Sequence, residues 1–510
     1  MELTTPAKLA FGRLGFGSRP SEHAAFVELG DTDEARLRAH IAVQLDPGSI
    51  DDSETNRRIA QAGFSSVDLD RSDLWRQFVR DVDDETDPST PLDELRLLTM
   101  LRATHSKRQL HEVLVDFWHN HFNVFGDSTV VRSMIMRYDR DVIRANALGN
   151  FRTMLGQVAE SACMLYYLDN YVSTVAGPNE NWARELLELH TLGAENYLGS
   201  DLGQADVEGF PEPVGYVDED VYEATRAFTG WSVAHGRDED PDDGTFLYRA
   251  DAHDRFNKRV LGQELGPDQP DLADGRMVLD LLATHPGTAR HVSRKLCRRF
   301  VADDPPDALV ESAAQVFLAN VDAVDQLRTV VEHIVLSDEF AVSWGAKVKR
   351  PFDAAVSVLR ATELDLSFAP DDAPSQAFMR SYAGMGQPLF GWPSPDGYAD
   401  NSGYWLNTNS VFKQWRLTNA LLASSNDDGR YLVDVEGSTP DDAGSAEELV
   451  DYWTVRLLGE AASDESRVAL VEFMGQGFDP SFDLGRDDET QERIRALVST
   501  ILMMPEFQWQ

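Results

Sequence analysis

Hydrophobic side chains recur every three to four positions along most of the chain, with charged side chains between them. This period is typical of amphipathic helices that bury one face. Alternation with a period of two, which is typical of strands, is convincing only at 231–234 and 245–249. The pattern therefore predicts an all-α protein with many helices. The predicted helices span 22–29, 34–45, 70–82, 91–103, 107–124, 131–146, 149–161, 181–192, 218–229, 275–285, 287–301, 307–319, 323–337, 348–362, 373–384, 408–422, 446–459, 464–475 and 488–503.

Long acidic loops connect some of these helices, and we interpret them as solubilising insertions. The loops span 81–87, 236–244, 266–275 and 426–447. Two segments, 327–340 and 494–507, align without a gap, which suggests a helical pair used twice; chance similarity between amphipathic helices explains the alignment equally well. We expect a main helical domain over 1–345, which carries the candidate site, and a C-terminal helical lobe over 346–510 that packs on it.

The 510-residue chain has 87 Asp and Glu against 46 Lys and Arg, a formal net charge of −41, and 7 of its bases are Lys. This composition is typical of halophilic proteins, because the Debye length in molar salt falls to about 3 Å and self-repulsion is screened. The same charge argues against nucleic acid as a partner, since binding phosphates requires a positive field. No apolar run approaches the roughly 20 residues of a membrane span, and no signal peptide is visible. We therefore expect a cytoplasmic protein, or one whose leader has been removed.

The segment 180–193 concentrates ionisable side chains on one helical face. At 100° per residue, Arg184, Glu185 and Glu188 fall in one arc, and leucines occupy the opposite arc. Pairs at i,i+4, such as Arg184 with Glu188, contribute about 0.2–0.5 kcal/mol on an exposed helix. The segment is therefore either a solvated, ion-paired face or part of a functional site.

The segment 107–124 contains His119 and His121, which together suggest a His-x-His metal site. On a helix the two rings point about 160° apart, so they cannot bind the same ion. His121 lies at the centre of an apolar arc, and His190 also falls among apolar positions. Burying an imidazole without a partner costs about 1–3 kcal/mol, so each ring needs a hydrogen-bond partner or a metal ion.

If the helices 107–124 and 181–192 pack together, we expect a site for a divalent metal ion or for acid–base chemistry between them. The candidate metal ligands are His121, Glu185, Glu188 and His190. The candidate catalytic residues are His121, Arg184, Glu185 and Glu188, with Arg184 holding a carboxylate in place. Two core histidines satisfied by ordinary hydrogen bonds are the alternative.

A basic cluster lies at 290–299, in a chain that has few bases elsewhere. Like charges at i,i+4 repel, so something anionic should face this helix. The anion is either the acidic arc of 180–188 or a bound phosphate, sulfate or carboxylate. In the second case Arg294, Lys295 and Arg298 are the candidate anion-binding residues.

A proline-rich loop at 385–398 presents the rings of Phe390, Trp392 and Tyr398, which need either a packing surface or a ligand such as a sugar. The sequence contains no standard motif for nucleotide hydrolysis, Rossmann oxidoreduction or zincin proteolysis. These three classes are therefore not leading interpretations.

Several motifs point to a known family. They are Phe11-Gly-Arg-Leu-Gly-Phe-Gly, Asp116-Phe-Trp-His-Asn-His-Phe-Asn-Val, Asn179-Glu-Asn-Trp-Ala-Arg-Glu-Leu-Leu-Glu-Leu-His-Thr-Leu-Gly, Asp220-Val-Tyr-Glu-Ala-Thr-Arg-Ala-Phe-Thr-Gly-Trp, His285-Pro-Gly-Thr-Ala-Arg-His-Val-Ser-Arg-Lys-Leu-Cys-Arg-Arg-Phe, Lys349-Arg-Pro-Phe and Gly391-Trp-Pro. Over nearly the whole chain the sequence resembles the family called domain of unknown function 1800. The resemblance implies one family unit over 1–510, mostly helical, frequently exported and often encoded beside a sulfatase-like partner, with no activity to carry over.

The resemblance also changes the weight of individual residues. Members of the family commonly have an aromatic residue where His190 stands and vary where His119 stands, which weakens His190 as a general ligand. The emphasis moves to a set of polar residues on the two helices. These are Asn120, His121, Asn181, Arg184, Glu185 and Glu188.

Two functional hypotheses follow from these observations. The first is an all-helical enzyme with a carboxylate and histidine site, either a metal-dependent hydrolase or a redox enzyme. The second is a non-catalytic binding or assembly partner of a sulfatase-like protein. In that case the polar helix at 180–188 is a structural ion-pair lock against the basic helix at 290–299.

Overall fold

Helices dominate the computed structural model, which describes residues 2–207, 215–237, 240–425 and 431–510. Within these ranges there are 26 α-helices, several 3-10 and π turns, and two small two-stranded sheets. The predicted mostly helical class is confirmed. In the same ranges no helix is long and apolar enough to cross a membrane.

Every predicted helix overlaps an observed one. The helices before the strands are α1 (Thr5–Gly12), α2 (His23–Val27), α3 (Asp33–Gln44), α4 (Ser53–Ala62), α5 (Arg71–Trp75), α6 (Thr90–His105), α7 (Gln109–His121), α8 (Thr129–Arg137), α9 (Phe151–Ala159), α10 (Ala162–Tyr167), α11 (Asn181–Glu185) and α12 (Asp218–Ala227). The helices after the strands are α13 (Ala273–Ala283), α14 (Pro286–Phe300), α15 (Asp307–Ala319), α16 (Gln326–Val335), α17 (Asp338–Ala341), α18 (Pro351–Ala361), α19 (Ala373–Ala383), α20 (Ser402–Trp405), α21 (Thr408–Ala423), α22 (Val435–Ser438), α23 (Ala446–Leu458), α24 (Asp464–Gly475), α25 (Asp488–Met503) and α26 (Pro505–Gln508).

Helices outside the predicted ranges lack the signal on which the prediction depends. Helix α4 buries only Thr55 and Ala62, so it has no apolar stripe. Helix α10 has six residues, and α17, α20, α22 and α26 have four each. A helix this short cannot show a helical period in the sequence.

Three predicted helices change from α to π winding partway along. The π turns are η3 (Arg76–Arg80), η4 (Tyr138–Arg144) and η6 (Leu186–Thr191). Segment η6 continues α11, and the Thr191 hydroxyl donates to the Leu186 carbonyl at 2.6 Å. A π turn holds more residues than an α turn, so side chains beyond Leu186 depart from the spacing of an ideal α-helix. Glu188 and His190 both lie in this turn.

Two hairpins form the sheets. Strand β1 (Trp231–His235) pairs antiparallel with β2 (Asp242–Tyr248), which confirms both predicted strands. Strands β3 (Lys258–Val260) and β4 (Gln263–Leu265) form a hairpin that the pattern does not predict. Its turn residues Leu261 and Gly262 have φ of 49° and 78°, as a type I′ turn requires. Leucine rarely adopts this conformation, so the sequence carries no turn signal here.

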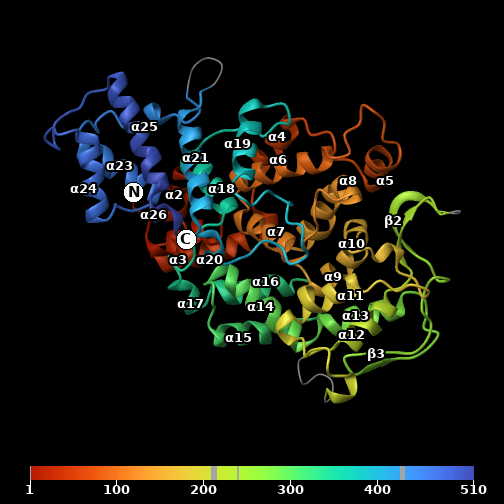
Figure 1. Cartoon of the computed structure of the whole chain (residues 1–510). Helices are drawn as coiled ribbons and strands as arrows, with labels where there is room; N and C mark the ends of the chain where they lie inside the picture. Colours follow the sequence, from red (N-terminus) through yellow and green to blue (C-terminus); the bar gives the residue numbers. More distant parts are fainter. Residues whose placement is uncertain (1, 208–214, 238–239, 426–430) are drawn as a thin grey trace.

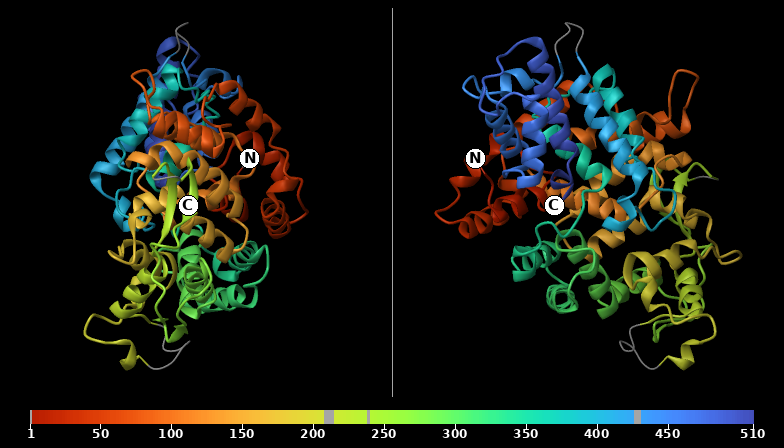
Figure 2. Two further views of the ribbon diagram at one scale, coloured as in Figure 1. Left: turned by 90° about the vertical axis from the view of Figure 1, so that its right-hand side faces the viewer. Right: turned by 60° about the vertical axis from the view of Figure 1, so that its left-hand side comes forward.

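Helix α18 is the innermost helix, and all eleven of its residues are buried. It packs against α6, α19 and α21. Helices α23, α24 and α25 lie on one side with the N-terminus, whereas α9 to α13 and the strands lie at the other end (Figures 1 and 2). Buried hydrophobic side chains form one continuous core that extends from Leu3 to Phe507.

The division at residue 345 and the internal repeat stay predictions. The N-terminal segment packs on the C-terminal lobe, where Lys8 forms an ion pair with Glu460. The two repeat segments fold as α16 with α17 and as α25 with α26, a helix followed by a four-residue helix, but the first helices have 10 and 16 residues. Parts of two predicted acidic loops, 238–239 and 426–430, lie outside the described residues.

Candidate functional site

Helix α14 carries the basic cluster and directs part of it into a cavity. One stripe of the helix, which includes Leu296, is buried in the core. The 3.6-residue period places His291, Lys295 and Arg298 together on another face. This face lines a cavity of about 780 Å³.

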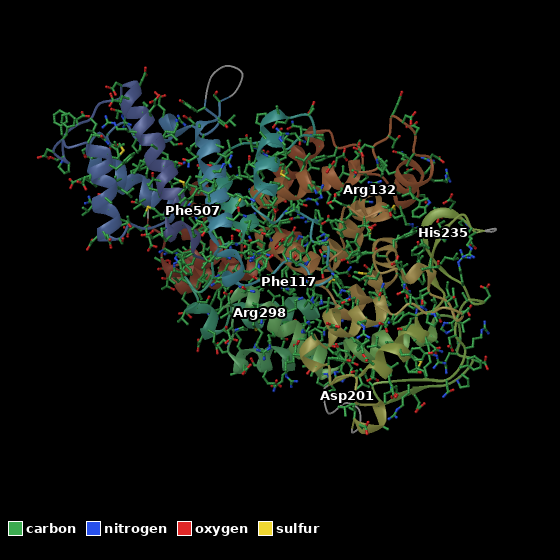
Figure 3. All side chains as sticks on the ribbon, viewed as in Figure 1. Phe117, Arg132, Asp201, His235, Arg298 and Phe507 are labelled. Carbon is green, nitrogen blue, oxygen red and sulfur yellow. The ribbon has the colours of Figure 1, made fainter. Side chains whose placement is uncertain are left out.

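Most residues that line the cavity come from α14, the C-terminal end of α7 and the segment 392–404, and Leu189, Glu195 and Arg350 complete the lining. In Figure 3, Phe117 of α7 and Arg298 of α14 lie close together in the middle of the molecule, and both line the cavity. The lining residues are Phe117, Asn120, His121, Leu189, Glu195, His291, Arg294, Lys295, Arg298, Arg299, Arg350, Trp392, Asp396, Gly397, Tyr398, Ala399, Asp400, Asn401 and Tyr404. The three predicted anion-binding residues and two predicted aromatic residues thus line one cavity.

The C-terminal end of α7 and the segment just after it hold the aromatic loop in place through two asparagines. The side-chain oxygen of Asn120 accepts from the Tyr398 amide at 3.1 Å, and the side chain of Asn123 donates to the Ser394 carbonyl at 2.7 Å. Between these contacts Gly397 has φ of 72°, and a Cβ there would lie 2.2 Å from the Asn120 carbonyl oxygen. Only glycine lets the loop come this close to α7.

One wall of the cavity is a buried ionic network around Asp353. Arg299 approaches the Asp353 carboxylate at 3.3 Å and Arg350 at 2.9 Å, and Arg350 also pairs with Asp116 at 2.6 Å. Burial would raise the pKa of Asp353, but Arg299 and Arg350 outweigh it and hold that pKa well below its ordinary value. The charges of this wall are therefore matched within the protein.

Lys295 lies against the same cavity without such a match. Its ammonium group makes no hydrogen bond or ion pair with any residue in the described part of the chain. Burial lowers the pKa of Lys295 to about 8, and Arg298 adds to the lowering while Asp400 opposes it. At neutral pH the side chain is therefore mostly a cation that lacks a direct partner.

The two predicted anion-binding arginines are partly engaged. Arg294 pairs at 2.8 Å with Asp307, a residue of α15 whose side chain is 88 % exposed, and Arg298 donates to the Asp303 carbonyl at 3.0 Å. An exposed pair of this kind is weak and contributes about 0–1 kcal/mol. Both guanidinium groups therefore keep donors that a bound anion can use.

His121 is 1 % exposed and also lines the cavity. Its Nε2 lies 3.1 Å from the His190 carbonyl oxygen, and because a carbonyl only accepts, Nε2 carries the proton. Burial, with Lys295 as the next cause, lowers the pKa of His121 well below its ordinary value, so the ring is neutral. Its Nδ1 is then a buried acceptor that has no partner among the described residues.

The other two histidines of the sequence argument take different positions. His190 is fully buried, neither of its ring nitrogens has a partner within the described chain, and burial lowers its pKa to about 3. The His121 and His190 ring centroids are 6.2 Å apart, so α7 and η6 do pack together. His119 lies away from both and contacts Asp139 at 3.0 Å. The prediction that His119 and His121 cannot share one ion agrees with this arrangement.

Glu185, Glu188 and Arg184 do not line the cavity. Arg184 pairs with Glu180 at 3.4 Å and with Asp218 at 3.5 Å. Burial raises the pKa of Glu185 to about 7, with Glu188 as the next cause and Arg184 in opposition. No hydrogen bond joins Glu185 to a described residue.

The predicted metal ligands His121, Glu185, Glu188 and His190 are not assembled as a set. In the ranges that the structure describes, no three His, Cys, Asp or Glu side chains are grouped so that they could hold a metal ion. The physical reason is that the two histidines point into the core, whereas Glu185 and Glu188 lie half-buried on a different face. The π turn adds to this separation.

The predicted lock between 180–188 and α14 has no ion pair among the described residues. Two arginines of α14 instead pair with α15, Arg290 with Glu311 at 3.1 Å and Arg294 with Asp307 at 2.8 Å. The contact between η6 and α14 is a hydrogen bond, from His291 Nε2 to the Leu189 carbonyl at 3.2 Å. Helix α14 thus finds its anions on a neighbour that the sequence argument does not consider.

Sequence reasoning also missed several residues of the cavity, including Arg350, Asp396, Asp400 and Tyr404. The rings of the proline-rich loop indicate a packing surface or a ligand site. Asp396 and Asp400 could not be recognised in the same way, because aspartates are common throughout this acidic chain. Arg350 lies in one of the family motifs, which was its only mark in the sequence. The sequence of the loop and the sequence of α14 do not predict that these two segments line one cavity.

Fold and cavity together define a mostly helical protein with a basic, aromatic-walled cavity between α7, α14 and the loop 392–404. The chain belongs to the family described as "Protein of unknown function (DUF1800)", whose model matches residues 9–509. This match agrees with the resemblance seen in the sequence. Neither a curated protein nor a solved structure matches the chain.

Proposed function

We propose that the protein binds a small organic anion in the cavity between α14 and the loop 392–404. The observation that carries the proposal is the ammonium group of Lys295, a cation beside a cavity with no partner among the described residues. Arg294 and Arg298 add planar donors that suit phosphate, sulfate or carboxylate groups. Desolvating these cations is costly, and an anionic ligand would offset that cost.

The rest of the cavity suggests what the anion is attached to. A volume of about 780 Å³ lies in the range of small-molecule sites, which is roughly 300–1,000 Å³. The rings of Trp392, Tyr398 and Tyr404 supply apolar surface to the same cavity. Aromatic walls stack on sugar or planar rings, so we expect the ligand to carry its charge on such a ring.

The test is calorimetric titration of the protein with sulfate, inorganic phosphate and a sugar phosphate. We expect Lys295→Met to weaken binding by at least about tenfold, because a charge-assisted hydrogen bond contributes about 1.5–3 kcal/mol. Lys107→Met is the matched control, since Lys107 is exposed and its side chain has no partner among the described residues. Equal affinities for wild type and Lys295→Met would refute the proposal. Tighter binding of the sugar phosphate than of inorganic phosphate would support a role for the aromatic wall.

Catalysis at the same cavity is the second candidate, and it is favoured by the unpartnered Nδ1 of His121. A neutral imidazole that lines a ligand cavity can accept a proton from a bound hydroxyl or water. Under this candidate His121 keeps its predicted catalytic role, whereas Glu185, Glu188 and Arg184 lie outside the cavity lining. No metal ion is part of this proposal, since the predicted ligands are spread over two faces.

The catalytic candidate is tested with p-nitrophenyl phosphate, sulfate and acetate as substrates. We expect His121→Gln to lower turnover by about 10²–10⁴-fold, the usual contribution of a general base. The variant should still bind the anion, because His121 is not one of the proposed cationic groups. Equal turnover by wild type and variant would exclude His121 as the base. If wild type turns over none of the three esters, hydrolysis of such esters is excluded and the binding function stands alone.

A further inference from the structure

A second groove lies on the surface between α19 and α21, which run side by side (Figure 1). It has a volume of about 520 Å³. Its basic residues are Arg380 of α19 and Lys413 and Arg416 of α21. This groove shares no lining residue with the cavity beside α14.

The three bases of the groove are available to a partner. None of their side chains makes a hydrogen bond or ion pair with any residue that the structure describes, and no carboxylate is among the described lining residues. Elsewhere exposed arginines find acids readily, as Arg467 does with Asp451 at 2.6 Å. In a chain with net charge −41, three unmatched bases in one groove form a local positive site.

One exposed aromatic side chain lies beside these bases on α21. Phe412 is 55 % exposed, whereas Trp415 points about 160° away from Lys413 and donates its Nε1 to the Met503 carbonyl at 3.1 Å. Phe412 lies one helical turn before Arg416, so the ring and the guanidinium group share a face of the helix. Exposed aromatic side chains next to arginine are typical of protein interfaces rather than of a bare surface.

We propose that the groove between α19 and α21 is a docking site for an acidic segment of another protein, with Phe412 packing on its apolar side chains. Charge complementarity selects this occupant, because the groove is positive and the surrounding protein is acidic. Nucleic acid suits the site less well, since a long polyanion would extend beyond three bases onto a repelling surface. A second copy of this chain would bring its own charge of −41 against the first.

The experiment measures fluorescence anisotropy with a short fluorescein-labelled peptide in which pairs of Glu alternate with Leu. The groove variant is Lys413→Glu with Arg416→Glu, and the matched control is Arg71→Glu with Lys107→Glu, two exposed bases far from the groove in sequence. We expect the groove variant to bind the peptide at least about tenfold more weakly, because like charges across an interface are strongly unfavourable. The control variant and Lys295→Met should bind as wild type does. Circular dichroism melting checks that both double variants remain folded.

Other outcomes would overturn the proposal. Equal binding by wild type and groove variant would show that the groove does not hold the peptide. Loss of binding in Lys295→Met would place the peptide in the cavity beside α14 instead. Single-stranded DNA that binds wild type as tightly as the peptide does, and is lost in the groove variant, would identify a nucleic-acid site. Self-association seen by sedimentation and lost in the groove variant would identify a second copy as the occupant.

Discussion

The cavity beside α14 has two basic walls that differ in one respect. On one wall Arg299 and Arg350 share the buried Asp353, and each guanidinium group has a carboxylate within 3.3 Å. On the other wall Lys295 has no partner among the described residues. Both walls have positive groups, yet only on the first wall does each of the named groups have a carboxylate as a direct partner.

The difference separates charges that hold the fold from charges that are available to a ligand. A carboxylate compensates a buried guanidinium group, and removing the one carboxylate that pairs with Arg299 would leave an unpaired buried charge. A buried cation without a direct partner is costly to the fold, and it is the kind of group from which we infer a ligand site. Four experiments test this separation.

The largest effect is expected at Asp353. Replacing Asp353 with Asn leaves Arg299 with no carboxylate, so we expect the free energy of unfolding to fall by about 3–5 kcal/mol. Urea unfolding monitored by circular dichroism gives this value. Asp307→Asn is the control, since it removes an exposed partner of Arg294 and should cost less than about 1 kcal/mol. If Asp353→Asn and Asp307→Asn lowered the free energy of unfolding by similar amounts, the distinction between the two walls would be wrong.

The pH dependence of anion binding is the next largest effect. The pKa of Lys295 is lowered to about 8, so its positive charge is lost as the pH rises through that value. We expect the affinity for sulfate to fall by about tenfold between pH 7 and pH 9, because sulfate itself does not titrate in this range. Stability should move in the opposite direction, rising from about pH 8 to pH 10, since the unfolded chain still binds the lysine proton there. A Lys295→Met protein whose sulfate binding shows the same pH profile would contradict the assignment.

A smaller effect is expected at Glu185, next to the cavity. Its pKa is raised to about 7, so the folded protein holds this proton more tightly than the unfolded chain. This contribution to stability is present at low pH and is lost as the pH rises from about 4.5 to 7. Glu185→Gln should therefore raise the free energy of unfolding at pH 8, by less than about 1 kcal/mol because the carboxylate is only half-buried. A matching gain at pH 4 would show that the change acts through packing and not through charge.

The smallest effect is expected at Arg184. Its ion pairs with Glu180 and Asp218 are long and half-exposed. We expect Arg184→Ala to lower the free energy of unfolding by about 0.5 kcal/mol or less. A structural lock against α14 would instead require a loss of about 3–5 kcal/mol. Thermal melting of this variant therefore decides between the two interpretations of the polar helix.

Most of the helices were predictable, because a helix with one buried face shows apolar residues every three to four positions in the sequence. The sequence predicts that the arc of α7 that contains His121 is apolar, and the structure buries that arc in the core. The prediction failed where this apolar period or a turn motif is missing from the sequence, as in the polar helix α4 and the turn at Leu261. The angular positions predicted for side chains beyond Leu186 are also wrong, because the π turn changes the spacing of side chains and no sequence motif predicts such a turn.

The candidate site was predictable only in part. The sequence predicts either an internal counterion or an anion site at Lys295 and its neighbours, because like charges in a row need a counterion, and the structure places Arg294, Lys295 and Arg298 on one cavity. The metal site at His121 and Glu185 was inferred from two helices that do pack, but packing alone does not bring side chains on different faces together. Asp353 and Asp400 could not be found, since one acid among 87 has no local signature.

By itself the sequence determined the helices, their buried faces and the surplus of negative charge, because these are properties of single segments and of composition. Only the tertiary structure decided which charges meet. Arg299 and Asp353 are 54 positions apart and Arg350 and Asp116 are 234 apart, and nothing local links them. Ion pairing depends on the distance between two groups in the folded protein. That Lys295 has no direct partner among the described residues could therefore be seen only in the tertiary structure.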